Sequence, residues 1–178
     1  MKTIKKVFFV KSVEQIPCPC CNGPLDVIGS RRRKYINGLG EQRVLIIRRL
    51  RCEHCRRIHH ELPDILVPYK RYGSKSIEAV ITGDTELTVS ADESTICRWR
   101  NWFSALQNHF LGCLASIATL LGKESVKEMS CLSQSALTRI RHYVGNAAGW
   151  LARVVRPVAN INCWVHTRFA FLSTTYRI

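Results

Sequence analysis

Four cysteines arranged as two CxxC pairs constrain the fold of this chain most strongly. Cys18 and Cys21 form the first pair, and Cys52 and Cys55 form the second. Two residues between paired cysteines let a tight turn direct both sulfurs at one point, and two such turns complete a tetrahedral site of four thiolates. The spacing therefore predicts one Zn²⁺ ion. Its role should be structural, because four protein ligands leave no open position for catalysis.

Other residues near these pairs leave alternatives open for the ligand set. Cys20 lies inside the first pair, but only Cys18 with Cys21 has the CxxC spacing, so we expect Cys20 to be a bystander. Three histidines are close enough in sequence to replace a thiol: His54, His59 and His60. A redox-active pair or a set of buried free cysteines is the other interpretation of the same pattern.

Each turn that carries a CxxC pair is called a zinc knuckle. The 30 residues between Cys21 and Cys52 exceed the usual interval between two zinc knuckles. A β-hairpin explains the excess, because Asn37-Gly38 is a strong hairpin-turn signal and the β-branched run 44–47 suits a strand. The order knuckle, hairpin, strand, knuckle is that of a zinc ribbon. We therefore assign residues 1–72 to a small zinc-ribbon β domain.

The remaining segment, residues 73–178, has helical periodicity. Helices are predicted over 74–81, over a long stretch that begins near Asp92, over 133–155 and over 158–171. The fold class is therefore α+β, with the zinc ribbon followed by an all-α domain.

Residues 74–104 are a candidate helix-turn-helix within this domain. Four polar residues lie near one face of its second helix, at spacings of three and four: Ser94, Thr95, Arg98 and Asn101. Trp99 and Phe103 can point inward, which is the division of roles in a DNA-reading helix. The loop 82–91 is longer than the usual three- or four-residue turn. A plain amphipathic helix with a solvated polar face is the alternative.

The charge of the chain favours polyanionic partners. The formal net charge is +14, and residues 1–73 alone hold 16 Lys and Arg against 6 Asp and Glu. Duplex DNA is the expected partner, and five arginines of the first domain are candidate phosphate contacts: Arg31, Arg32, Arg33, Arg48 and Arg49. Runs of this kind can also be simply solvated.

The sequence has no feature that predicts secretion or membrane insertion. The apolar run Val7–Val10 is shorter than the core of a signal peptide, and Phe110–Leu121 is shorter than the roughly 20 residues that span a bilayer. Cysteines are kept reduced in the cytosol, where CxxC pairs bind metal. We expect a cytoplasmic, nucleoid-associated protein.

Several motifs together resemble a bacterial protein family of unknown function, DUF6431. They are CPxC, RRLRCEHCRRIHHELPDILVPYKRY, ESTICRWRNWF and GWLARVVRPVANINCWVHTRFAFLS, which together cover about residues 18–173. Members of the family look like the front end of a transposase, a zinc ribbon followed by a helix-turn-helix. The resemblance implies DNA binding and an origin in a mobile element, and it supplies no catalytic residues.

The distribution of acidic residues argues against an enzyme. A typical transposase holds two metal ions with three carboxylates, and residues 129–178 contain no Asp or Glu. We therefore expect a regulator or a targeting subunit, with a transposase or another protein as a further candidate partner. Two alternatives remain. One is an RNA-binding zinc ribbon. The other is an adaptor whose zinc ribbon docks a partner protein, with the stretches Phe110–Leu121 and Trp164–Leu172 supplying apolar contact.

Overall fold

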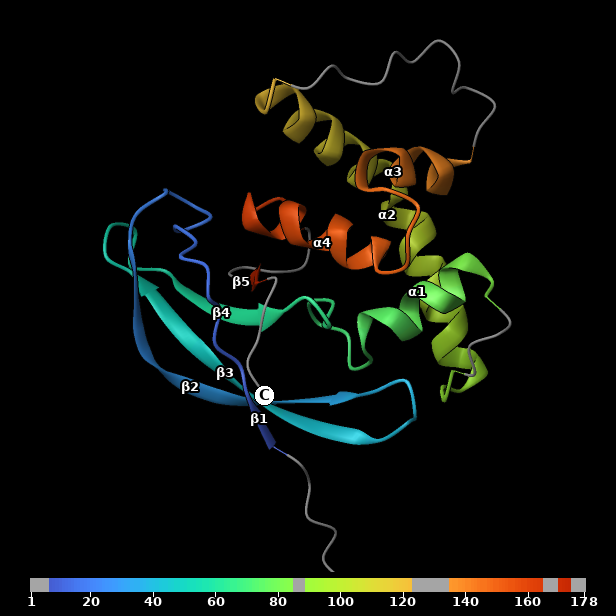
Figure 1. Cartoon of the computed structure of the whole chain (residues 1–178), viewed down its shortest axis with the longest axis horizontal. Helices are drawn as coiled ribbons and strands as arrows, with labels where there is room; N and C mark the ends of the chain where they lie inside the picture. Colours follow the sequence, from blue (N-terminus) through green and yellow to red (C-terminus); the bar gives the residue numbers. More distant parts are fainter. Residues whose placement is uncertain (1–6, 85–88, 123–134, 165–169, 174–178) are drawn as a thin grey trace, which may run out of the picture.

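The computed structural model of the chain describes residues 7–84, 89–122, 135–164 and 170–173. In these residues a five-stranded sheet is combined with four helices, which confirms the α+β class (Figure 1).

The longest pairing in the sheet is the hairpin of β2 (Leu25–Ile36) and β3 (Gln42–Cys52). The Asn37 side chain closes its turn, because its Oδ1 accepts from the backbone N–H groups of Leu39 at 3.0 Å and Glu41 at 2.9 Å. Asparagine supports turns in this way because its side chain can replace a backbone acceptor. The hairpin predicted between the two CxxC pairs is thus confirmed.

Three shorter strands complete the sheet. β1 (Val7–Phe9) runs parallel to the first half of β3, and β4 (Ile58–Pro63) runs antiparallel to its last residues. β5 (Ala170–Ser173) then pairs in parallel with β4. Strands from near both ends of the described residues therefore contribute to a sheet whose central strand is β3 (Figure 1).

The helices are α1 (Ser74–Thr82), α2 (Glu93–Leu120), α3 (Ala136–Val144) and α4 (Trp150–Asn160). The start predicted for the long helix is confirmed, since the Asp92 carboxylate caps α2 by accepting from the Thr95 N–H at 2.6 Å.

Two helix predictions were wrong. The predicted helix 133–155 is interrupted between α3 and α4, where Gly145 and Gly149 have φ of 82° and 84°; residues 133–134 lie outside the described residues. The predicted helix 158–171 is wrong because α4 ends at Asn160 and residues 170–173 form a strand; residues 165–169 lie outside the described residues.

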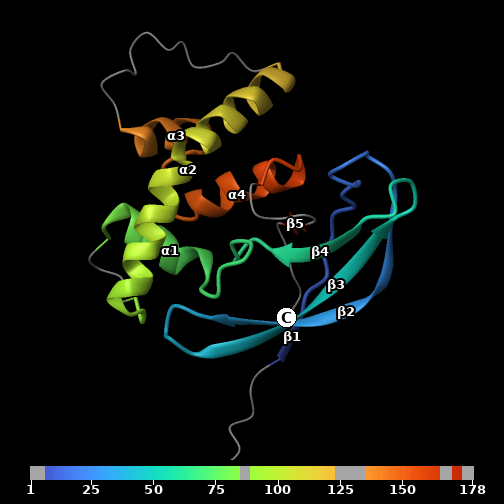
Figure 2. The same ribbon diagram turned by 180° about the vertical axis from the view of Figure 1, so that it is seen from behind.

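The helices pack on one side of the sheet and enclose a hydrophobic core (Figures 1 and 2). Leu45 and Ile47 of β3 supply the sheet side of this core, and Trp150 of α4 is 1% exposed within it. The Trp150 ring contacts the Phe103 ring of α2 edge-on, with 5.6 Å between the centroids. The division into segments 1–72 and 73–178 stays a prediction, and side chains of both contribute to this core.

A buried carboxylate fixes the junction of α1 and α4. Glu78 of α1 is 9% exposed and accepts from the backbone N–H groups of Gly149 at 2.6 Å and Leu151 at 2.9 Å. The first turn of a helix has unpaired N–H groups and a partial positive charge, so a carboxylate there is favourable. Gly149 has no side chain to cap α4 itself, and Glu78 performs this role from another helix.

We expect Glu78→Gln to lower the free energy of unfolding by about 1–3 kcal/mol, because an amide nitrogen would replace one of two buried acceptors. The matched control is Glu93→Gln on the exposed first turn of α2, which should cost less than about 1 kcal/mol. Urea denaturation of the two variants provides the comparison. Equal losses would contradict a capping role for Glu78.

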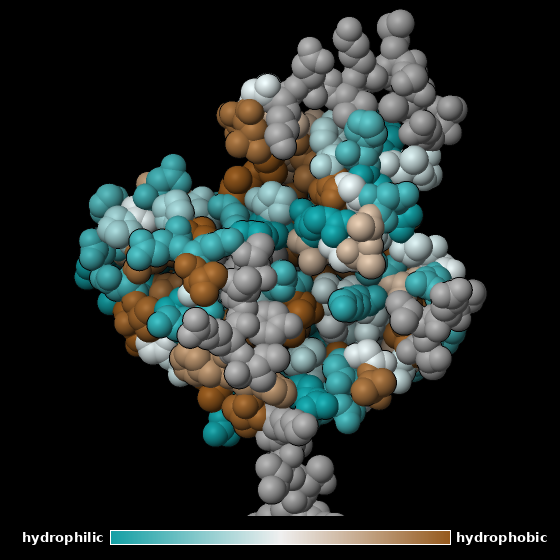
Figure 3. Space-filling model, viewed as in Figure 1, coloured by the Kyte–Doolittle hydropathy of each residue, from teal (hydrophilic) through white to brown (hydrophobic). Residues whose placement is uncertain are grey.

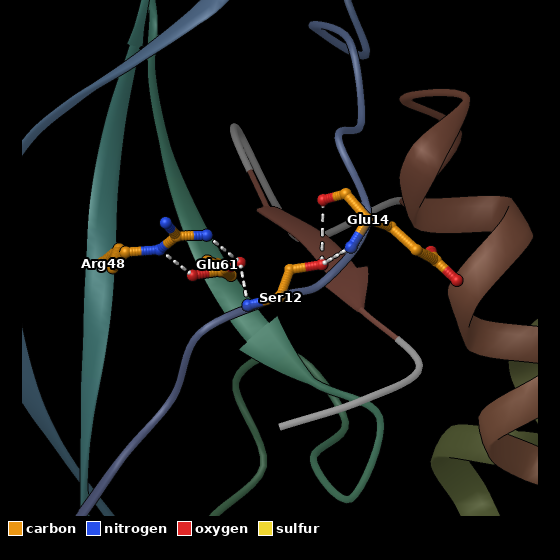
Figure 4. A network of polar contacts seen from close by, with 4 residues as sticks. All are labelled: Ser12, Glu14, Arg48 and Glu61. Carbon is orange, nitrogen blue, oxygen red and sulfur yellow. Dashed lines mark hydrogen bonds and ion pairs between the residues drawn. The ribbon is translucent and has the colours of Figure 1, made fainter. Parts of the chain in front are cut away.

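A second buried carboxylate connects the N-terminal segment to the sheet. Glu61 of β4 is fully buried, and Arg48 of β3 donates to both of its oxygens at 2.5 and 2.7 Å (Figure 4). The Ser12 N–H donates to the same carboxylate at 2.9 Å. Breaking such a buried pair is costly because it leaves an uncompensated charge. Through Ser12, this network holds the segment that leads into Cys18 against the sheet.

Candidate metal centre and nucleic-acid interface

Two turns of the same shape carry the four cysteines. The Asn22 N–H donates to the Cys18 carbonyl at 2.9 Å, and the Arg56 N–H donates to the Cys52 carbonyl at 3.0 Å. Asn22 and Arg56 also share a left-handed backbone, with φ of 57° and 59°. The amide of each first cysteine donates to the carbonyl five residues later, at 2.9 and 3.0 Å. These turns are the knuckles that the CxxC spacing predicts.

The four thiols converge. The Cys18 and Cys55 sulfurs are 3.6 Å apart, the Cys21 and Cys52 sulfurs are 3.4 Å apart, and all four lie within 4.8 Å of one another. Sulfurs bound to one tetrahedral zinc at about 2.3 Å are separated by about 3.8 Å. The cluster can therefore hold one metal ion.

The first cysteines of the two knuckles differ in the pKa of their thiols. Burial raises the pKa of the Cys18 thiol to about 12. Burial also opposes ionisation of Cys52, but the backbone N–H of Cys55, the Cys21 thiol and the backbone N–H of His54 outweigh it and lower the pKa to about 6. Thiolates are the metal-binding form of cysteine, so Cys52 is prepared for a cation, whereas Cys18 needs the cation itself to ionise.

A second possible ligand set overlaps the first. His59 of β4 is buried, and its Nε2 lies 3.3 Å from the Cys18 sulfur. Cys18, Cys20 and His59 also have ligand atoms within 4.8 Å of one another. The two sets share Cys18, so they are alternative ligand sets for a single ion. The histidine alternative raised by the sequence is thus a structural neighbour of the four-thiol cluster.

The knuckles approach each other at Gly23. A Cβ at this position would lie 2.7 Å from the His54 Nδ1 and 3.1 Å from the Cys52 sulfur. The first distance is shorter than non-bonded atoms tolerate, so a side chain here would displace the exposed His54 ring and crowd the Cys52 sulfur. Glycine permits this close approach of backbone to side chain.

The five candidate phosphate-binding arginines lie on opposite faces of the sheet. Residues paired across strands share a face, and Arg31 and Arg33 pair with Ile47 and Leu45 of the core. Arg49 is on this face too, because it lies two residues after Ile47 in β3 and every second residue of a strand points to the same face. Arg32 and Arg48 are on the other face, and Arg48 is bound to Glu61.

The arginines of the helix side belong to a longer cationic series, which we call the basic row. His60 pairs with Arg49, and its pKa is lowered by burial and then by the charges of Arg31, Arg49 and Arg33. The Arg33 pKa is lowered by burial and by the charges of Arg31 and Arg71. Arg71 and Arg98 line one hollow. The basic row therefore comprises the cations Arg49, Arg31, Arg33, Arg71 and Arg98, with the His60 ring, whose lowered pKa favours its uncharged form, among them.

The predicted recognition residues lie at the start of α2. Ser94, Arg98 and Asn101 are exposed and Thr95 is partly buried, while Trp99 and Phe103 are buried, as predicted. The Arg98 guanidinium donates to the Ser94 carbonyl at 3.0 Å and to its hydroxyl at 2.7 Å. Helices α1 and α2 are separated by residues 83–92, of which 85–88 lie outside the described residues. The helix-turn-helix assignment stays a prediction.

Sequence reasoning missed three further residues beside Arg98. Tyr69, Lys70 and Arg71 line the same hollow as Thr95 and Arg98. The signal was their place in the PYKRY motif, where two adjacent cations are flanked by tyrosines. Spacing alone could not indicate that this segment meets α2.

The apolar stretches proposed for an adaptor are mostly internal. Phe110, Leu111 and Leu114 are buried in the core, as is Trp164; residues 165–169 lie outside the described residues. Apolar side chains do gather at the far end of α2, which carries the exposed Leu120 and Leu121 (Figure 3). No helix among the described residues is both long and apolar enough to cross a membrane.

Comparison with known proteins identifies one family. Residues 18–99 match the model of a domain of unknown function, DUF6431, so the resemblance is confirmed for this part of the chain. The match begins at the first cysteine of the cluster and ends at Trp99, and it therefore includes both knuckles, the basic row and the first turns of α2. No curated protein and no solved structure matches the chain.

If four thiolates hold the metal, Cys55→Ser should lose the bound ion and Cys20→Ser should retain one ion per chain. The two variants make the same chemical change in adjacent ligand sets, and the purified proteins can be compared by elemental analysis. Retention of metal by Cys55→Ser together with its loss from Cys20→Ser and His59→Ala would assign the ion to the second set instead.

Proposed function

We propose that the chain is a zinc-dependent DNA-binding protein that acts as a regulator or as the targeting subunit of a mobile element, rather than as a catalyst. The observation that supports this most directly is the basic row, which connects the sheet beside the metal centre with the start of α2.

The chemistry of the cluster supports zinc as the metal. Four thiolates in tetrahedral arrangement favour zinc over the hard cations, which prefer oxygen ligands. The cluster lies at the open end of the hairpin, where Leu25 pairs with Cys52. An ion there would join the strands that carry Arg31, Arg33 and Arg49, so its role is to position the interface.

The exposure and arrangement of the cations support DNA as the partner. Arg31, Arg71 and Arg98 are exposed, whereas the polar atoms of Arg48 are engaged by Glu61. Cations in a row neutralise successive phosphates and supply affinity without sequence preference. Arg98 and Asn101, at one end of the row, are side chains that can form paired hydrogen bonds with guanine and adenine edges. We therefore assign affinity to the sheet and preference to α2.

Selection from a random duplex pool with zinc-loaded protein at near-physiological salt should recover a consensus sequence. Arg98→Ala should lower the preference for that consensus by about 1–3 kcal/mol, because one base contact is lost. The control is Lys11→Ala, which removes an exposed charge outside the basic row. An unenriched pool would contradict sequence-selective binding, and a strong preference for RNA would favour the RNA-binding alternative.

Neighbouring arginines on opposite faces test which side of the sheet meets DNA. Arg31→Ala should reduce the slope of log affinity against log salt by about 1, because one phosphate contact is lost. Arg32→Ala removes the same charge from the other face and should leave the slope unchanged. The slopes follow from affinities at several salt concentrations, and equal slopes for both variants would place the interface elsewhere.

A further inference from the structure

A hollow of about 530 Å³ lies between the PYKRY motif and the first turns of α2. This volume is within the range of about 300–1,000 Å³ that small-molecule sites occupy. Its lining comes from β2, from the segment after β4 and from α2: Ile36, Tyr69, Lys70, Arg71, Tyr72, Asp92, Thr95, Arg98 and Trp99.

Aromatic rings form much of this lining. Tyr72 packs edge-on against the buried Trp99, with 4.8 Å between the ring centroids, which fixes the inner wall. Tyr69 is 64% exposed and has a left-handed backbone with φ of 62°, which is unfavourable for a bulky residue. An exposed aromatic ring beside a hollow provides a stacking surface for a nucleobase.

The charges around the hollow favour a phosphate. Arg71 and Arg98 are exposed in its lining, and Asp92 is the one acid among the described residues that form it. The Asp92 carboxylate is engaged by the Ser94 hydroxyl at 2.7 Å and the Thr95 N–H at 2.6 Å, which reduces its repulsion of an anion. Lys70 is held over the Trp102 ring at 4.4 Å and adds a further positive charge.

The hollow is continuous with the basic row. The Arg33 guanidinium donates to the Lys70 carbonyl at 3.0 Å, which connects β2 to the lining. The Nε of Arg33 is buried, with no hydrogen-bond partner among the described residues. A DNA strand that follows the basic row therefore passes the mouth of the hollow.

We infer that the hollow accepts one unpaired nucleotide of DNA, with its base stacked on Tyr69 and its phosphate against Arg71. This inference rests on the proposed DNA-binding function and deepens it. A base within a duplex is stacked on both faces and paired along one edge, so it enters a pocket only at the cost of these contacts, whereas an unpaired base enters at little cost. The protein therefore prefers DNA with an unpaired nucleotide, such as a bulge, to a perfect duplex of the same sequence.

Fluorescence anisotropy with three DNA probes of one sequence tests the inference. One probe is a perfect duplex, the second carries a single unpaired thymidine, and the third carries an abasic residue at that position. The zinc-loaded full chain should bind the thymidine probe about tenfold more tightly than the other two, because one stacked base contributes roughly that factor. The abasic probe separates stacking from the flexibility that any bulge introduces.

Two variants locate the effect at Tyr69. Tyr69→Leu should abolish the tenfold ratio while duplex affinity stays the same, and Tyr69→Phe, which retains the ring, should preserve it. The exposure of this side chain makes both variants compatible with folding, which circular dichroism verifies.

The outcomes distinguish this inference from the function on which it rests. Equal affinity of the wild-type chain for all three probes, with clear duplex binding, overturns the nucleotide site and leaves DNA binding intact. A ratio that persists in Tyr69→Leu also overturns it. Failure to bind any probe overturns the DNA-binding proposal and this inference together.

Discussion

The convergence of four thiols at the open end of the β2–β3 hairpin is the constraint on which the rest of the structure depends. Cys52 is the last residue of β3, and the first knuckle immediately precedes β2. A metal ion bound there joins both strands to the segment that leads into β4. His60 and Glu61 on β4 and the arginines across β2 and β3 lie on the strands that this junction joins.

The sheet separates two uses of arginine by alternation along its strands. On the helix side, Arg31, Arg33 and Arg49 extend toward the start of α2 as part of the basic row. On the other side, Arg48 binds the buried Glu61 and thereby stabilises the segment before Cys18. The neighbours Arg48 and Arg49 therefore have different roles, one in the interior and one in the proposed interface. For this reason the proposed function assigns DNA contacts to the arginines of the helix side alone.

Local signals in the sequence predicted the parts of the structure that are locally determined. The CxxC spacing indicated the thiol cluster, Asn37-Gly38 indicated the hairpin, and Asp92 indicated the start of α2. Each depends on a turn or a cap that a few neighbouring residues encode. The four cysteines of the candidate site could therefore be predicted before any tertiary contact was known.

The remaining features depend on contacts between residues far apart in the chain. The faces of Arg31 and Arg32 follow from the β2–β3 register, which shifts between Val27 and Gly29 and thereby exchanges the faces of later residues. Likewise, the residues of β5 form a strand because they pair with β4, more than 100 residues earlier in the chain. The sequence pattern of this segment alone suggested a helix. The hollow beside Tyr69 also requires the packing of two separate segments, which no spacing encodes.

The most direct test of this account is a zinc titration of the metal-free chain in the presence of labelled duplex DNA. If the metal centre positions the basic row, DNA binding should rise with added zinc and saturate at one equivalent per chain. Binding of equal affinity and equal salt dependence before and after zinc addition would contradict the account, because the interface would then form without the metal centre.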